Sequence, residues 1–149
     1  MEMNDRSKGF NGLVDWKIDR KVLLSTLWIF ALLNYLYCDI LTLMDASVLN
    51  QFLTGTVEGM QITQDLLLAG SVLMEIPIAM VLLSRVLKYR VNRWANMISG
   101  FIMTVVQAAT LISPSTSYYT FFSIIEIATT LVIFAVALKW TEPGEMSSL

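Results

Sequence analysis

Four long hydrophobic runs constrain the fold of this sequence more than any other feature. They cover residues 22–44, 66–87, 94–112 and 118–140. A helix needs about 20 apolar residues to cross the hydrocarbon core of a bilayer, and helices satisfy their own backbone hydrogen bonds there. The sequence therefore predicts an all-α, polytopic membrane protein, a four-transmembrane-helix bundle over residues 22–140. The third run is the shortest of the four, at 19 residues, and contains Ser99, Gly100, Thr104 and Gln107.

Charge is distributed unevenly between the two sides of this predicted bundle. All ten basic residues precede the first run, lie around the second connection or end the fourth run: Arg6, Lys8, Lys17, Arg20, Lys21, Arg85, Lys88, Arg90, Arg93 and Lys139. Cytoplasmic loops of membrane proteins are enriched in Lys and Arg. We therefore expect the N- and C-terminal segments, residues 1–21 and 141–149, to be cytoplasmic. In the long outer connection, residues 46–53 are expected to form a short interfacial or re-entrant helix, with turns at Gly55 and Gly59.

Several kinds of chemistry are not indicated. The chain has no histidine, and its one cysteine, Cys38, lies within a hydrophobic run. Histidine-based catalysis and zinc or haem sites therefore lack their usual ligands, and we expect no cofactor and no metal site. No nucleophile–base pair or phosphate-binding loop is present, so an enzyme is not favoured. The basic residues are too few for a nucleic-acid partner. The lipid bilayer is the expected environment.

Three acids within the runs, Asp39, Glu75 and Glu126, have no basic residue at comparable depth. A charged side chain near the bilayer centre costs roughly 2.5–3.5 kcal/mol on insertion scales, so such residues usually face a bundle interior and mark binding sites. From the helical rise, Asp39 lies roughly 7 Å from the outer end of its run, Glu75 roughly 13 Å and Glu126 roughly 12 Å. All three thus fall in the outer half of the membrane. We expect them to share one polar site.

Further polar residues lie near these acids in the predicted helices. Asn34 and Tyr35 share a helix face with Asp39, Thr130 lies one turn from Glu126, and Gln107 has a similar depth in the third run. The predicted ligand- or ion-binding residues are Asp39, Glu75, Glu126, Asn34, Tyr35, Gln107 and Thr130. Pro77 removes the donor for the Leu73 carbonyl and predicts a kink beside Glu75. We expect at least one of Glu75 and Glu126 to be protonated, or the pair to hold a cation.

Three stretches of the sequence resemble a known family: LWIFALLNYLYCDILTLMD at 27–45, MEIPIAMVLLSRVLKYRVNRWANMISG at 74–100 and FFSIIEIATTLVIF at 121–134. They are similar to a family of small four-span bacterial membrane proteins catalogued as a domain of unknown function. That resemblance implies a multi-pass protein of the bacterial inner membrane and no assigned activity. A weaker fold-level resemblance is to EXPERA-type proteins, on Asp39 and the Glu75-Ile76-Pro77 segment, and to DoxX-like four-helix bundles.

Three functions are compatible with these observations. The acids could bind or transport a proton, a cation or a cationic small molecule, and with only four helices transport would require a homo-oligomer. Alternatively, they could hold the amine or polar end of a lipid-like ligand in an EXPERA-like binding protein or isomerase. In the third interpretation the protein is a structural or assembly subunit, and its acids are interhelical hydrogen-bond groups.

Overall fold

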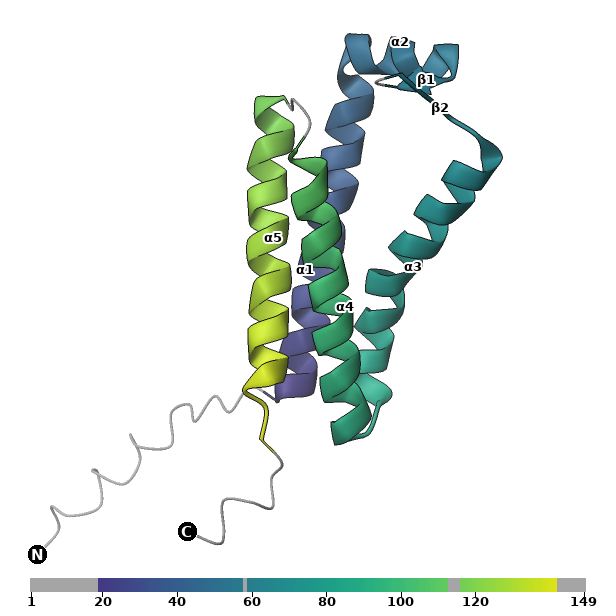
Figure 1. Ribbon diagram of the computed structural model, residues 1–149. Coiled ribbons are helices and arrows are strands. Elements are labelled where there is room, and N and C mark those ends of the chain that lie inside the picture. Colours follow the sequence, from purple (N-terminus) through teal and green to yellow (C-terminus); the bar gives the residue numbers. More distant parts are fainter. Residues whose placement is uncertain (1–18, 58, 113–115, 142–149) are drawn as a thin grey trace, which may run out of the picture.

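Four long helices lying side by side make up most of the structure (Figure 1). This computed structural model describes residues 19–57, 59–112 and 116–141. Its elements, in order, are α1 (Arg20–Met44), α2 (Ala46–Thr54), β1 (Thr56–Val57), β2 (Met60–Gln61), α3 (Gln64–Val86), α4 (Tyr89–Thr110) and α5 (Ser117–Leu138). The described part of the chain is thus mostly helical, with a short hairpin between α2 and α3. Helices α1, α3 and α5 are long and apolar enough to cross a membrane, which is consistent with a membrane protein.

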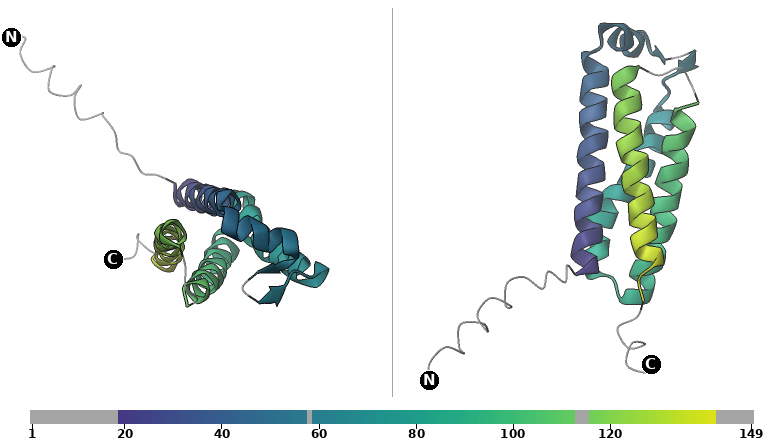
Figure 2. Two further views of the ribbon diagram at one scale, coloured as in Figure 1. Left: turned by 90° about the horizontal axis from the view of Figure 1, so that it is seen from above. Right: turned by 90° about the vertical axis from the view of Figure 1, so that its left-hand side faces the viewer.

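Consecutive long helices run antiparallel, and α5 lies between α1 and α4 (Figure 2). Helix α1 packs along α3 as well as α5, whereas α3 and α4 contact each other much less. Toward its α2 end, α3 leans away from the other long helices (Figure 1). Its buried residues, Pro77, Met80 and Ser84, all lie in its second half. The first half of α3 is therefore largely uncovered by the rest of the bundle.

The connection between α1 and α3 is compact and locally well specified. Asp45 ends α1 and begins α2: its backbone N–H donates to the Thr42 carbonyl (3.3 Å) and its side chain accepts from the Ser47 N–H (2.9 Å). Helix α2 lies crosswise to the long helices and has no buried residue, the orientation expected of an interfacial helix (Figure 1). Gly55 (φ 73°), directly before β1, and Gly59 (φ 83°), directly before β2, adopt left-handed conformations that favour glycine.

The opposite end of the bundle, called the basic end here, carries all the described cations: Arg20, Lys21, Arg85, Lys88, Arg90, Arg93 and Lys139. Several of them close helix C-termini. Lys21 Nζ donates to the Leu87 carbonyl (2.7 Å), and Arg93 donates from Nε to Ala137 (3.2 Å) and from a terminal nitrogen to Leu138 (3.0 Å). A cation is favourable there because the helix dipole places partial negative charge at the C-terminus.

The link between α3 and α4 is shorter than the basic turn in the sequence indicates. Only Leu87 and Lys88 separate the two helices, and α4 begins at Tyr89, whereas the predicted span began at Trp94. The physical reason is that a helix need not end where its hydrophobic run ends. The Asn92 N–H donates to the Lys88 carbonyl (2.9 Å), so the basic residues of this stretch form the first turn of α4.

Candidate functional site

One row of buried residues on α5 faces the interior of the bundle: Ser123, Glu126, Thr130, Ile133 and Ala137. The spacing of three and four residues places them on a single helix face. Glu126 is only 1% exposed, and neither oxygen of its carboxyl group has a hydrogen-bond partner within the described part of the chain. Buried polar groups are nearly always hydrogen-bonded, and an unsatisfied one requires an explanation. Glu126 is therefore the most unusual side chain of the structure.

Helix α1 carries three ionisable side chains close to the Glu126 carboxyl group. Tyr35, Cys38 and Asp39 all interact electrostatically with its carboxyl group. Tyr35 is buried and its hydroxyl, like the Glu126 carboxyl, has no hydrogen-bond partner among the described residues. Asp39 lies one turn further toward the α2 end and is exposed. Of these two acids, Glu126 is thus enclosed within the bundle and Asp39 lies at its surface.

The polar groups of α4 at this level are satisfied, in contrast to Glu126. Gln107 is buried and its Nε2 donates to Ser123 Oγ (2.9 Å). The Thr104 hydroxyl donates to Thr130 Oγ1 (2.8 Å), and the Thr130 hydroxyl donates to the Glu126 carbonyl oxygen (3.0 Å). These bonds tie α4 to α5. The side chains of Gln107 and Thr130 therefore frame the site and already have partners of their own.

Glu75 lies apart from this site. It is exposed, has no hydrogen-bond or ion-pair partner in the described ranges, and is absent from the electrostatic neighbours of Glu126. The reason lies in the phase of α3: Pro77, Met80 and Ser84 form its buried face, and Glu75 falls on the opposite face. The structure thus brings Asp39 and Glu126 together and directs Glu75 outward.

Two other residues singled out from the sequence have local roles. Asn34 is half-buried, and its Nδ2 donates to the Phe30 carbonyl of its own helix (2.8 Å). Pro77 is fully buried inside α3, in the region where that helix leans away from its neighbours. Neither residue contributes a polar group to the surroundings of Glu126.

A second polar cluster, the Asn96 network (Trp28, Ser84, Asn92 and Asn96), was not anticipated from the sequence. Asn96 Oδ1 accepts from Trp28 Nε1 (2.8 Å) and from Ser84 Oγ (3.1 Å), and Asn96 Nδ2 donates to Asn92 Oδ1 (2.7 Å). Asn92 Nδ2 donates in turn to the Ser84 carbonyl (2.6 Å). All four residues are fully buried. The sequence did hold a signal, because Asn92, Asn96 and Gly100 recur every fourth residue and therefore share one helix face.

The Asn96 network lies between the Glu126 site and the basic end. Trp28 precedes Tyr35 by two helical turns, roughly 10 Å along α1. Each side-chain amide and the indole N–H of this network has a partner, and its hydrogen bonds join α1, α3 and α4. From Glu126, the exposed acid Asp39 lies in the opposite direction, toward the α2 end. A hydrogen-bonded network thus lies on one side of Glu126, and an exposed acid lies on the other.

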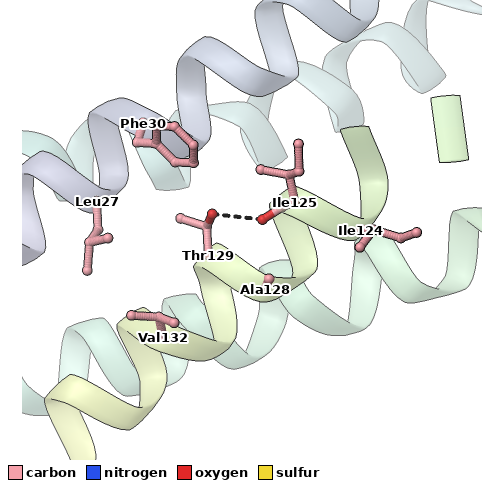
Figure 3. Close-up of a pocket in the computed structure, with 7 residues that line it drawn as sticks. All are labelled: Leu27, Phe30, Ile124, Ile125, Ala128, Thr129 and Val132. Carbon is pink, nitrogen blue, oxygen red and sulfur yellow. Dashed lines mark hydrogen bonds between the residues drawn. The ribbon is translucent and has the colours of Figure 1, made fainter. Parts of the chain in front are cut away.

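A shallow groove on the outer surface between α1 and α5 has a volume of about 300 Å³ (Figure 3). Its lining is almost entirely apolar: Leu27, Phe30, Ile124, Ile125, Ala128, Thr129 and Val132. The one hydroxyl in it, that of Thr129, donates to the Ile125 carbonyl of its own helix (2.7 Å). None of the predicted site residues lines the groove. It therefore offers no polar group to the head of a ligand.

The chain belongs to the family of unknown function DUF6326, whose family model matches residues 12–147. This confirms the resemblance to a family without an assigned activity. Comparison with curated proteins and with solved structures finds no match. The resemblance to EXPERA-type and DoxX-like proteins stays a prediction, and the function must be argued from the site itself.

Proposed function

We propose that this member of the DUF6326 family is a four-span membrane protein that binds a proton, or a small cation in its place, at Glu126. The bound ion exchanges with the α2 side of the membrane through Asp39, as the binding step of a transporter. The observation that carries the proposal is the Glu126 carboxyl group, fully enclosed and without a hydrogen-bond partner in the described part of the chain.

The distribution of residues on α4 supports counting it as the fourth span. Its buried face is polar and includes Asn92, Asn96 and Gln107, which lower its mean hydropathy. Apart from Arg90 in the first turn, its large exposed residues are apolar: Val91, Trp94, Ile98, Phe101, Ile102 and Val105. A helix of a water-soluble bundle has the reverse arrangement, with apolar residues inside and polar residues outside. A lipid-facing apolar surface around a polar interior explains why the mean hydropathy of α4 is lower than that expected of a membrane-spanning helix.

The charge asymmetry supports an orientation for the bundle. All described Lys and Arg residues lie at the basic end, and the positive-inside rule places that end in the cytoplasm. The α2 end, with Asp39 and the crosswise helix α2, then faces the outside of a bacterial inner membrane. Under this orientation the exposed acid Asp39 lies on the outer side of Glu126, and the Asn96 network lies on its cytoplasmic side.

The physical reason for ion binding is the cost of an isolated carboxylate in a dry interior. Such a group is stable there only when a proton or a cation neutralises it. Because no Lys or Arg of the described residues is among its electrostatic neighbours, Glu126 depends on an incoming positive charge. Its enclosure favours the smallest ligand, a proton. The nearby Tyr35 hydroxyl can donate or accept a hydrogen bond and so support either state of the carboxyl group.

Two competing functions receive less support. Glu126 makes no side-chain hydrogen bond to a neighbouring helix within the described residues, so it is poorly suited to hold helices together. A lipid-like ligand held by the acids would need a groove that reaches them, and the groove between α1 and α5 is lined by other residues. The geometry therefore favours ion binding over both alternatives.

The proposal is tested by ion flux in proteoliposomes that contain the purified protein and a pH-sensitive dye. We expect an imposed pH gradient to drive proton uptake with the natural protein, Glu126→Gln to abolish that uptake, and Asp39→Asn to slow it. Glu75→Gln is the matched control, because it makes the same acid-to-amide change on the outward face of α3. Parallel measurements with sodium and potassium gradients test a small cation as the ligand.

Two results would contradict the proposal. One is the absence of proton, sodium and potassium movement in every gradient. The other is flux that Glu126→Gln and Glu75→Gln reduce equally, since that would show a general effect of removing an intramembrane acid. A selective loss in Glu126→Gln supports the site as described.

A further inference from the structure

The outward face of α3 carries a heptad pattern of six residues, and all of them except the half-buried Ala79 are exposed. Spacings of four and three residues link Leu68, Val72, Glu75, Ala79, Leu82 and Val86. The large apolar members are among the most exposed in the structure, at 64% for Leu68, 63% for Val72, 68% for Leu82 and 71% for Val86. This spacing is that of the contact positions of a left-handed coiled coil. We call these six residues the α3 seam.

Glu75 lies in the middle of the α3 seam. Its side chain is exposed on a helix that is long and apolar enough to cross a membrane, and it has no partner within the described ranges. A carboxyl group facing hydrocarbon at that depth is costly and calls for a hydrogen-bonding group at the same depth. Lipid tails cannot provide one. The α3 seam is therefore a surface that another helix with a polar group at its centre would fit.

We propose that the α3 seam binds a second copy of the chain, with two α3 helices packed in parallel about a two-fold axis. Two copies inserted in the same direction place Glu75 opposite Glu75, because residue i meets residue i at a two-fold axis between parallel helices. One carboxyl O–H then donates to the other carboxyl group, so each acid has the partner that the single chain lacks. The small side chain of Ala79, one turn from Glu75, allows close helix approach at this level.

The seam itself indicates which partner fits. A single polar residue among the apolar contact positions of a coiled coil fixes the register and the number of chains. Only a helix whose polar group matches Glu75 in depth satisfies the carboxyl group without sliding along the seam. A second copy of α3 meets this condition by symmetry. Pro77 lies on the opposite, buried face of α3, so its ring does not enter the seam.

This interface is separate from the Glu126 site. Glu126 lies on α5 and faces α1, whereas the α3 seam faces away from the bundle. Glu126→Gln should therefore keep the dimer, so loss of ion flux with an intact dimer is distinguishable from loss of the dimer.

Disulfide crosslinking in native membranes tests the geometry. In a Cys38→Ala background, which removes the buried natural cysteine, Val72→Cys and Leu82→Cys place single cysteines in the seam on either side of Glu75. Phe101→Cys is the matched control, because Phe101 is similarly exposed, at 60%, but lies on α4. We expect mild oxidation to produce crosslinked dimers with the two seam variants and not with the control.

The role of Glu75 is tested by measuring dimer affinity in lipid bilayers by single-molecule photobleaching over a range of protein densities. We expect Glu75→Gln to keep the dimer, because an amide both donates and accepts, and Glu75→Leu to weaken it roughly tenfold. Three results would overturn the proposal: seam cysteines that crosslink no better than Phe101→Cys, crosslinks only to a protein of different mass, or a Glu75→Leu variant with unchanged dimer affinity.

Discussion

Replacing Glu126 and Gln107 by methionine should change stability in opposite directions. Both residues are buried polar side chains on facing helices. Gln107 donates a hydrogen bond to Ser123 (2.9 Å), whereas neither oxygen of the Glu126 carboxyl group has a partner in the described part of the chain. Methionine has a similar length to both and adapts to irregular spaces. The two substitutions therefore differ mainly in whether the polar group that is removed had a hydrogen-bond partner.

The magnitudes follow from these contacts. An unsatisfied buried polar group costs about 1–3 kcal/mol, so Glu126→Met should raise the free energy of unfolding by an amount in that range. An interhelical hydrogen bond in a membrane protein contributes on average about 0.6 kcal/mol and up to about 1.7 kcal/mol. Gln107→Met should accordingly lower the free energy of unfolding by roughly 1 kcal/mol. A functional residue that reduces stability is a common trade-off.

Equilibrium unfolding in mixed detergent micelles, followed by tryptophan fluorescence at neutral pH, measures both changes. The same proteoliposome assay of ion flux should show that the more stable Glu126→Met protein is inactive. A Glu126→Met protein that is clearly less stable than the natural one would refute the reasoning. That result would mean that Glu126 holds helices together, as in the structural interpretation.

Three further predictions concern the packing around the site. Asn96→Ala leaves the indole N–H of Trp28 and the Ser84 hydroxyl without their acceptor, so it should lower the free energy of unfolding by about 2–4 kcal/mol. The control Asn34→Ala loses only a bond within its own helix and should lower it by less than about 0.5 kcal/mol. Equal costs would contradict the Asn96 network. At Gly100 an added Cβ would lie 3.2 Å from the Thr130 carbonyl oxygen. Gly100→Leu should therefore separate α4 from α5 and lower the free energy of unfolding by about 1–3 kcal/mol, and Gly100→Ala should lower it by less. A tolerated leucine would show that the two helices are not in close contact. Arg93→Met removes the donors to the last carbonyls of α5 and should speed amide hydrogen exchange in its final turn, at a cost of about 0.3–1 kcal/mol; unchanged exchange would rule out this capping role.

The long helices and their sequence ranges followed from hydrophobicity, because each run has about the length of a membrane span and the helix period is fixed. The start of α4 did not, since hydrophobicity marks where lipid begins and a helix can extend beyond it. Glycine positions were informative: Gly55 and Gly59 do adopt the turn conformations that their type suggests.

The candidate site was only partly predictable for a related reason. Depth along the bilayer follows from sequence position, so Asp39 and Glu126 could be placed at a common level. Which way a side chain points within the bundle depends on how each helix is rotated against its neighbours, and this is why Glu75 was expected inside and is found facing outward. Hydrophobicity does not reveal the Asn96 network, because hydropathy does not say which face of a helix an asparagine occupies. Its four-residue spacing carried the information.

Infrared spectroscopy of the protonated carboxyl group in proteoliposomes shows whether Glu126 binds a proton that exchanges with the α2 side. We expect a carboxylic acid band that is present in the natural protein, responds to pH on the α2 side and is lost in the difference spectrum with Glu126→Gln. Asp39→Asn should keep the band and slow its response to pH. A spectrum unchanged by Glu126→Gln, together with no bound sodium or potassium, would mean that Glu126 binds neither a proton nor a small cation.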